Sequence, residues 1–558
     1  MNRKLCFIAV LGASVALSSC SKKLGQFQSD YFSVNPNPLE VVGDKVPATV
    51  TGRVPQKFFK KNAEVTVTPY LVFNGTEVAS QAYSFQGEKV RGNNPVISYD
   101  NGGTVTIPVS YLYQPEMNSS VLELAFTVNQ GSKQYVLPRV QVATGVIPTA
   151  AFATAKTVTP AIAPDAFQRI INEKYSADIM FLINVANIRA GQLKTNAMDE
   201  LRKEILATAG NPSLELKEIN INSYASPDGP EAFNYQLAEK REKNTVNYVE
   251  GVLKKDKITE FGELTKNFTA EDWEGFKELV SKSNIQDKDL ILSVLSMYKD
   301  PQQRERELRN LAAVFEVLAD QILPQLRYSR ITASIDVIGK SDKEIQDLFK
   351  SNPKELSVEE ILYCATLTDN LNDRMKIYET ATRIYPNDYR TWNNLGVTQY
   401  EAGEYNAAKA NFQKALSLNS KCAEAKMNLG LIAVLDKDYA KANEYFGQAA
   451  GADGLNNALG VYYLKMGDNA SAVRAFGDSK TNNAALAQIL TKDYSKAKAT
   501  LAAIAKPDAT TYYLKAVLAA RTNNEADVKA NLAKSISLDK TMSDRAANDL
   551  EFANFNIK

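Results

Sequence analysis

The spacing of hydrophobic residues changes character twice along the chain, and each part predicts a different kind of structure. Between residues 27 and 148, short runs alternate apolar and polar side chains and are rich in β-branched residues. Alternation with a period of two is typical of half-buried β-strands. The clearest runs cover residues 46–50, 64–68, 104–109 and 122–128, with turn signals such as Asn74-Gly75 between them. This part of the chain is predicted to be a β-sandwich.

From residue 166 to residue 340 the pattern mixes the strand and helix periods. Strands are predicted at residues 179–185, 216–224 and 331–338, and helices at residues 198–206 and 231–254. The longer helix follows the turn Ser226-Pro227-Asp228-Gly229-Pro230, which is a typical helix start. A further helical stretch over about 269–327 precedes the last strand. The segment before this part, residues 149–165, is rich in Ala, Thr and Pro and predicts a linker.

From residue 341 to the end the pattern is helical and repeats itself. Leu395-Gly396 recurs as Leu429-Gly430, and Phe412 recurs as Phe446, each 34 residues further on. This spacing resembles that of tetratricopeptide repeats, in which small residues allow close helix packing and the aromatic side chain fills the interface with the next repeat. Later copies are weaker, with Phe476 following after 30 residues. The resemblance implies an all-α solenoid.

Stacked helix pairs of this kind have a concave face lined by the first helix of each repeat. Those helices are predicted at residues 389–401 and 423–435. Polar positions that packing does not need are candidates for a protein-binding groove, in which amides would bond an extended peptide backbone: Asn393, Asn394, Thr398, Lys426 and Asn428. The alternative is that these are solvated helix positions. Under the groove interpretation, replacing Asn394 and Asn428 by alanine is expected to leave the melting temperature nearly unchanged while protein partners are lost.

The first twenty residues carry a targeting signal. Arg3 and Lys4 precede an apolar run at residues 5–17, which is too short to span a bilayer. The run ends in Leu17-Ser18-Ser19-Cys20, which resembles the lipobox of bacterial lipoproteins. The resemblance implies a signal peptide over residues 1–19 and lipidation of Cys20; a plain secretory signal is the alternative. Basic residues after Cys20 favour the periplasmic face of the outer membrane over surface export.

The mixed part of the chain resembles the OmpA-like peptidoglycan-binding domain. The resemblance rests on strand 219–224, the turn after it, and Asn234, Leu237 and Arg241 on the following helix. In that family an aspartate and the arginine grip the zwitterionic diaminopimelate of the wall peptide. Arg241 matches the arginine, but Ser226 stands where the aspartate is usual, and Asp228 is displaced by two positions.

The resemblance therefore makes Arg241, Asp228, Ser226 and Asn234 candidate peptidoglycan-binding residues. Two alternatives stay open from the residues themselves. Arg241 would be a surface arginine paired with Glu242 or Asp228, and Asn234 would bond the turn.

The composition of the chain excludes some kinds of catalysis and disfavours some kinds of ligand. The chain has no histidine, so Ser-His-Asp and Cys-His catalysis within it are excluded. Lys and Arg total 65 against 64 Asp and Glu, a balance that does not favour nucleic acid. The four cysteines lack metal-binding or redox spacing. We expect no cofactor, no metal site and no enzymatic activity.

These parts together predict a multidomain lipoprotein of the outer membrane. The expected boundaries are 1–19 for the signal peptide, 20–148 for the β-sandwich, 149–165 for the linker, 166–340 for the OmpA-like α/β domain with its helical insert, and 341–558 for the repeats. The expected partners are the outer membrane through acyl chains on Cys20, envelope proteins through the repeats, and peptidoglycan. A protein-interaction scaffold is favoured; a simple peptidoglycan tether and a surface-exposed antigen or assembly factor are alternatives. The protein partners and the oligomeric state are left open.

The first prediction concerns the anchor. Metabolic labelling with a palmitate analogue should mark the wild-type protein, because the signal ends at a cysteine that can accept lipid. Cys20→Ser should abolish the label, while Cys422→Ser serves as a matched control that keeps it. Equal labelling of the Cys20→Ser protein would contradict the lipoprotein interpretation.

Overall fold

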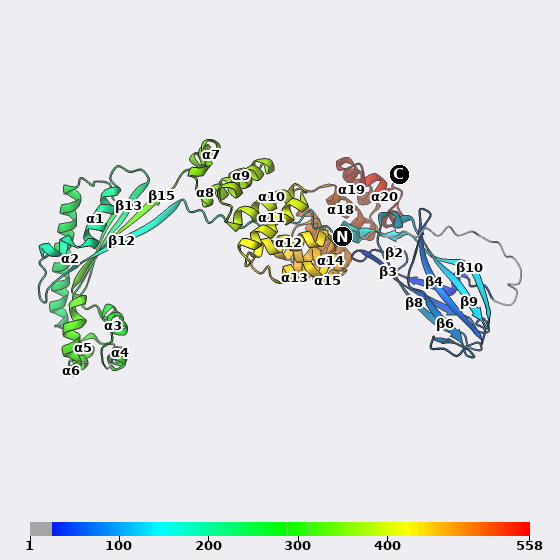
Figure 1. Cartoon of the computed structure of the whole chain (residues 1–558), viewed down its shortest axis with the longest axis horizontal. Coiled ribbons are helices and arrows are strands. Elements are labelled where there is room, and N and C mark those ends of the chain that lie inside the picture. The colour runs from blue at the N-terminus through cyan, green and yellow to red at the C-terminus, as the bar shows by residue number, and fades with distance from the viewer. Residues whose placement is uncertain (1–24, 287, 311, 558) are drawn as a thin grey trace. The chain divides into compact units, whose positions relative to one another are not determined.

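A computed structural model describes residues 25–286, 288–310 and 312–557, so the signal peptide and Cys20 lie outside the described residues. The chain divides into two compact units (Figure 1). One, which we call the split unit, combines Met1–Pro164 with Thr368–Lys558. The other, the inserted unit, is Asp165–Leu367. The boundary before the repeats thus falls at residue 367, later than the expected boundary at 340.

The N-terminal part of the split unit is rich in sheet, as expected. One sheet has the order β1-β3-β8, and a second has the order β10-β9-β4-β6-β7 with β5 paired to β4. Buried residues of both sheets form one hydrophobic cluster, so the sheets share a core. The strands are β1 (Phe32–Asn35), β2 (Leu39–Glu40), β3 (Lys45–Val54), β4 (Ala63–Phe73), β5 (Thr76–Ala79), β6 (Tyr83–Gly87), β7 (Val96–Ile97), β8 (Gly103–Leu112), β9 (Val121–Gln130), β10 (Lys133–Thr144) and β11 (Val146–Ile147).

The predicted turn at Asn74-Gly75 closes the β4–β5 hairpin, in which Phe73 pairs with Thr76. Both turn residues have positive φ, at 47° and 73°. A two-residue loop with this geometry matches the twist of the strands it joins, and Asn-Gly adopts it at low cost. The turn signal therefore fixed the register of this hairpin.

The inserted unit is built on a mixed sheet in the order β12-β15-β13-β14, in which β13 and β14 run parallel. Helices α1 and α2 pack on the sheet, and α3 to α6 form the helical insert before β15. The elements are β12 (Ile170–Met180), α1 (Asn196–Ala207), β13 (Leu214–Tyr224), α2 (Glu231–Lys255), β14 (Glu263–Thr269), α3 (Trp273–Lys282), α4 (Lys288–Met297), α5 (Pro301–Asn310), α6 (Ala312–Gln321), β15 (Tyr328–Ile338), α7 (Asp342–Ser351) and α8 (Val358–Cys364).

The strand predicted at residues 179–185 is wrong in its position. The structure has β12 at Ile170–Met180, paired with β15 over its whole length. Much of β12 is polar and exposed, so its sequence carries no apolar alternation. The apolar run after it is a loop in which Leu182 and Ile183 are more than half exposed. Pairing with a neighbouring strand, which one segment of sequence does not reveal, decided the outcome.

The C-terminal part of the split unit is all-helical, as expected from the repeats. Among residues 25–557 apart from 287 and 311, no helix is both long and apolar enough to cross a bilayer. The helices are α9 (Leu371–Ile384), α10 (Tyr389–Glu401), α11 (Tyr405–Leu418), α12 (Ala423–Leu435), α13 (Tyr439–Gly447), α14 (Leu455–Met466), α15 (Asn469–Phe476), α16 (Asn482–Leu490), α17 (Tyr494–Ala502), α18 (Ala509–Arg521), α19 (Glu525–Leu538) and α20 (Met542–Ala547). The two predicted groove helices coincide with α10 and α12.

A glycine on the first helix of a repeat faces a phenylalanine on the second. A β-carbon built on Gly396 would lie 2.6 Å from the Phe412 ring. The same contact recurs at 2.4 Å between Gly430 and Phe446, and at 2.5 Å between Gly460 and Phe476. The ring therefore packs directly on the backbone of the neighbouring helix, which only glycine permits.

This contact generates a prediction with an internal control. Gly396→Leu should lower the free energy of unfolding of the split unit by about 1–3 kcal/mol, because the Phe412 ring has no room to move away. Gly447→Leu is the matched control, since a β-carbon there meets nothing within 4 Å. Thermal unfolding followed by circular dichroism should separate the two variants. Equal melting temperatures would contradict the packing argument.

Candidate functional site: a main-chain-binding groove in the repeats

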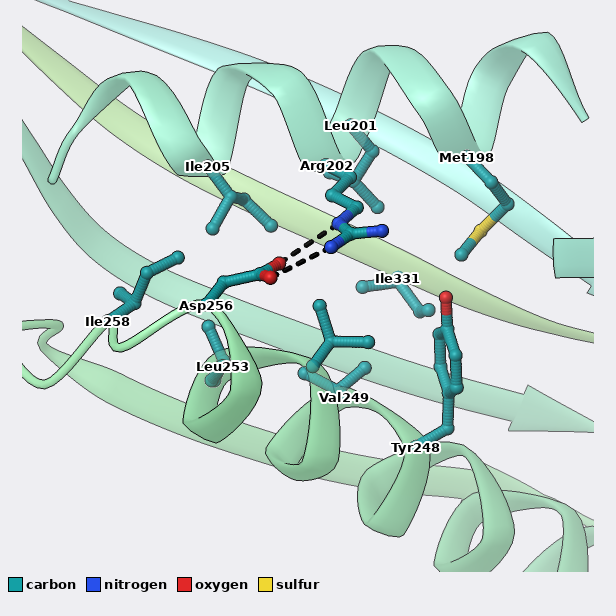
Figure 2. Close-up of a pocket in the computed structure, with 11 residues that line it drawn as sticks. Met198, Leu201, Arg202, Ile205, Tyr248, Val249, Leu253, Asp256, Ile258 and Ile331 are labelled. Carbon is teal, nitrogen blue, oxygen red and sulfur yellow. Dashed lines mark hydrogen bonds and ion pairs between the residues drawn. The ribbon is translucent and has the colours of Figure 1, made fainter. Parts of the chain in front are cut away.

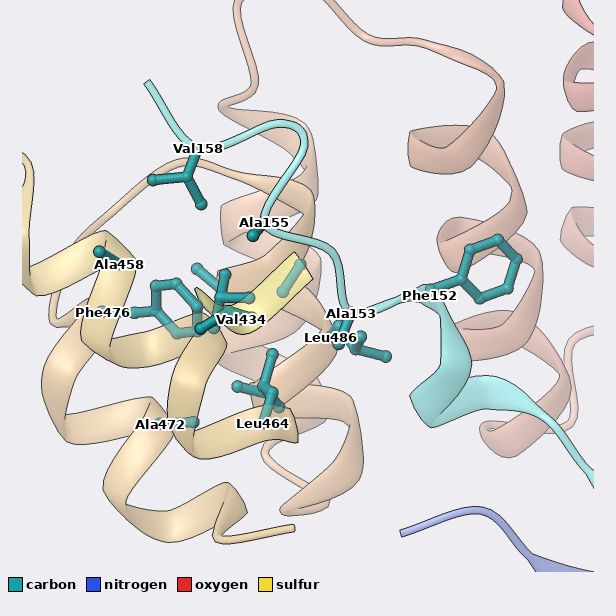
Figure 3. Close-up of a cluster of buried hydrophobic side chains, with 14 of the residues drawn as sticks. Phe152, Ala153, Ala155, Val158, Val434, Ala458, Leu464, Ala472, Phe476 and Leu486 are labelled. Carbon is teal, nitrogen blue, oxygen red and sulfur yellow. The ribbon is translucent and has the colours of Figure 1, made fainter. Parts of the chain in front are cut away.

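The groove of the repeats is occupied by a segment of the same chain. Residues 152–158 run along the helices, and their buried side chains share one hydrophobic cluster with side chains of α12, α14 and α16 (Figure 3). The segment follows β11 directly and begins with a short 3-10 helix at Thr149–Phe152. It continues to Ala163, which is fully buried. The expectation of a linker at 149–165 is therefore wrong for residues 149–163, which are a packed part of the split unit.

Three asparagines hold this segment by its backbone. Asn394 accepts from the Ala163 N–H at 2.8 Å and donates to the Ala163 carbonyl at 3.0 Å. Asn428 does the same with Ala161, at 2.7 and 2.8 Å. Asn483 pairs with Thr154 in the same way, at 3.1 and 2.9 Å. Each side-chain amide thus replaces the partner strand that an extended backbone would otherwise need.

Two more side chains complete the network. Asn393 donates to the Ala161 carbonyl at 3.0 Å and accepts from Asn428 at 3.1 Å. The Tyr400 hydroxyl donates to the Ala155 carbonyl at 2.6 Å, and burial raises the pKa of this phenol. Asn393, Tyr400, Ala155 and Ala161 are buried, so each bond between them replaces water that has been excluded. Leaving one of the buried partners unpaired would cost about 1–3 kcal/mol.

The largest side-chain contacts of the segment lie near its start, and Val158 is buried further along. The Phe152 ring lies 4.9 Å from the Tyr513 ring, and the Arg545 guanidinium lies over it at 3.6 Å. The Thr149 hydroxyl donates to Glu551 at 2.5 Å, and Arg521 pairs with the same carboxylate. This end therefore joins the sheet-rich part to the last helices of the repeats.

The five predicted groove residues have different positions in the structure. Asn393, Asn394 and Asn428 bond an extended backbone, although that backbone belongs to the chain itself. Thr398 is buried and donates to the Leu395 carbonyl of its own helix. Lys426 is half-buried and lies outside this network. Their role toward a separate protein stays a prediction.

Sequence reasoning missed Asn483 and Tyr400. Asn483 could have been found from the sequence, because an Asn-Asn pair occurs both at Asn482-Asn483 in α16 and at Asn393-Asn394 in α10. Tyr400 has no such signal. The segment itself was missed because alanine-rich sequence with two prolines reads equally well as a linker.

In the inserted unit the predicted wall-binding residues come together, but Arg241 faces inward. It is fully buried and donates to the carbonyls of Leu182, Tyr224 and Val185 at 3.1, 2.8 and 3.1 Å. Burial, followed by the nearby Arg327 guanidinium, lowers the pKa of Arg241 to about 10. The alternative of an exposed arginine paired with Glu242 or Asp228 is therefore wrong.

Asp228 is paired with a different arginine. Arg327, at the end of the helical insert, lies 2.8 Å from the Asp228 carboxylate and 3.0 Å from the Ser226 hydroxyl. Ser226 in turn donates to Asp228 at 2.6 Å. Asn234 donates to the Ser226 and Gly229 carbonyls at 3.1 and 2.9 Å, so it holds the turn, as one of the two alternatives proposed. Sequence reasoning missed Arg327 because it lies about a hundred residues from the turn.

A small apolar slot lies between α1 and α2 of the inserted unit (Figure 2). Arg202 crosses its mouth and donates to Asp256 at 2.9 and 2.8 Å. Most of its lining belongs to the hydrophobic core beneath the helices. Within the described part of the chain, no three His, Cys, Asp or Glu side chains gather into a candidate metal site.

The helix pairs and their groove define a tetratricopeptide repeat region. The family model "Tetratricopeptide repeat" matches residues 389–422, which cover α10 and α11. No curated protein matches the chain.

Solved structures are similar to parts of the chain at low identity. A tetratricopeptide repeat protein from Parabacteroides merdae is 13% identical, over 38% of this chain and 91% of that one, with a TM-score of 0.30. PilF of Pseudomonas aeruginosa is 18% identical, over 36% and 95%, with a TM-score of 0.28. YrrB, described as a tetratricopeptide repeat protein with an unusual peptide-binding site, is 22% identical, over 30% and 97%, with a TM-score of 0.23.

The backbone network generates a prediction that reverses the expectation from sequence. Asn394→Ala combined with Asn428→Ala should clearly lower the melting temperature of the split unit, because backbone groups of Ala161 and Ala163 would stay buried without partners. The matched control replaces Asn406 and Asn443, which are exposed on the second helices of the same repeats. The control should melt like the wild type. A double groove variant that also melts like the wild type would rule out a stabilising role for these bonds.

Proposed function

We propose that this chain is a lipid-anchored scaffold of the bacterial cell envelope that binds other proteins. One observation carries the proposal: side-chain amides in a tetratricopeptide groove bind the backbone of a chain segment at three places. A groove of this kind forms hydrogen bonds with main-chain N–H and carbonyl groups, which every protein has, so it is suited to bind peptide segments. The expectation that the chain is not an enzyme stays a prediction.

The location in the envelope rests on the N-terminal sequence. The basic, apolar and small-residue order that ends at Cys20 supports lipidation there and, with the residues after it, the periplasmic face of the outer membrane. Thr149, Phe152 and the asparagine network join the sheet-rich part, which follows the anchor in sequence, to the repeats. The repeats are therefore joined through this segment to the sheet-rich part, which lies next to the proposed lipid anchor in sequence.

Contact with peptidoglycan is the second candidate function, and it belongs to the inserted unit. The strand and helix order from β12 to β15, with Arg241 and Asn234 on α2, supports the resemblance to the OmpA-like domain. The buried position of Arg241 argues against that residue as a direct ligand of the wall peptide. Asp228, with its carboxylate partly accessible beside Arg327, is the group left to meet an ammonium.

The proposal is tested by cross-linking the full-length protein in intact envelopes and capturing it. Captured material is analysed by mass spectrometry for proteins and, after muramidase digestion, for muropeptides. A scaffold should give the same set of cross-linked proteins in replicate captures, and the Cys20→Ser protein, which lacks the anchor, should lose most of them. Muropeptides without proteins would favour the simple tether. Capture of neither proteins nor muropeptides would overturn both proposed functions.

The wall contact has a separate readout. If Asp228 meets the wall peptide, Asp228→Asn should reduce co-sedimentation with purified peptidoglycan several-fold, while Asp289→Asn on α4 should not. A wild-type protein that stays in the supernatant would instead assign the inserted unit to another contact.

A further inference from the structure

We infer that the part of the groove formed by Asn393, Asn394 and Asn428 is an exchangeable peptide site. The partner it accepts is an extended protein segment with small side chains at alternate positions. In the structure, Ala161 and Ala163 hold that place as an internal ligand. The inference rests on the proposed function, because it names the chemistry of the partner that the scaffold binds.

The contacts at this site do not depend on the identity of the occupant's side chains. Asn394 and Asn428 each bond the N–H and the carbonyl of one residue. Asn393 donates a second hydrogen bond to the Ala161 carbonyl. Every extended segment presents the same groups with the same spacing, except at proline. Any chain that fits sterically therefore makes these bonds equally well.

Steric fit selects small residues at every second position. Ala161 and Ala163 are 3% and 0% exposed, whereas Ile162 between them is 41% exposed. A methyl group is thus the largest side chain that the structure places against these amides. The pattern Ala-x-Ala, with a free choice at x, describes the occupant that the groove accepts.

The two ends of the internal segment are held in different ways. Near its start, Phe152 packs against Tyr513 and Arg545, and Thr149 bonds Glu551. At Ala161 and Ala163, buried methyl groups and backbone bonds are the contacts made. Release of the later end therefore exposes little apolar area, while the fixed start keeps the segment close at high effective concentration. An external segment must compete with the tethered internal segment. This competition lowers the apparent affinity of the external segment for the groove but does not prevent its binding.

The test measures fluorescence anisotropy of a labelled synthetic peptide with the sequence of residues 156–165 against the full-length protein in detergent. Ala161→Glu combined with Ala163→Glu should expel the internal segment, because carboxylates do not fit against the buried amides. This opened variant should bind the peptide at least tenfold more tightly than the wild type. Ile162→Glu is the matched control, since that side chain is already exposed, and it should bind as weakly as the wild type.

Two further measurements decide what the site recognises. Adding Asn394→Ala and Asn428→Ala to the opened variant should abolish binding, and so should leucine in place of both buried alanines of the peptide. An opened, folded variant that binds no peptide overturns the inference, and equal binding of the leucine peptide overturns the size selection. A concentration-dependent dimer in which an Ile162→Cys variant cross-links to α12 of another copy would assign the site to a second copy instead.

If the opened variant does not fold, hydrogen exchange of the wild type decides. The amides of Ala161 and Ala163 should exchange at least tenfold faster than that of Thr154, and protection equal to the helices would overturn exchangeability. The envelope capture remains independent of these assays. Peptide binding without captured proteins would reject the scaffold function alone, and captured proteins without peptide binding would reject the groove as their site.

Discussion

The pairing of side-chain amides with the backbone of residues 154–163 is the interaction on which the split unit depends. Asn394, Asn428 and Asn483 supply what a neighbouring strand would supply in a sheet, so a segment with small side chains stays buried without unpaired polar groups. Because this segment leads directly from β11 into the groove, the sheet-rich part and the repeats form one compact unit although the inserted unit separates them in sequence.

The same pairing explains why the repeats are not a free binding surface in this structure. A solenoid contacts only near neighbours along its length, so its groove is ordinarily available to others. Here a tethered occupant has no translational freedom to lose on binding, an advantage that an external peptide lacks. An external partner in the groove would use the same bonds that hold the split unit together, so its entry would weaken the hold between the two parts of the chain.

Local patterns predicted much of the fold, and long-range pairing decided the rest. The 34-residue period located α10 and α12 and the Gly396–Phe412 contact, because neighbouring helices make both. The Asn74-Gly75 turn was equally local. In contrast, β12 depends on β15, more than 140 residues away, and the occupant of the groove lies more than 230 residues from Asn394. The asparagines were recognisable as backbone-binding groups, but nothing in their own repeats indicated which backbone they bind.

Asn394 and Arg241 show the same principle with different consequences. Each is a polar residue at the spacing of a binding motif, and each bonds carbonyls of its own chain. The carbonyls on Arg241 belong to a loop and a strand end inside one folded unit, so breaking these bonds would leave a cation buried without partners. Those on Asn394 belong to a segment that is held at Ala161 and Ala163 by backbone bonds and buried methyl groups, and a competing backbone would satisfy the same amide. Whether a motif residue stays available to a ligand therefore depends on whether another backbone can replace the chain segment that already bonds it, not on the motif.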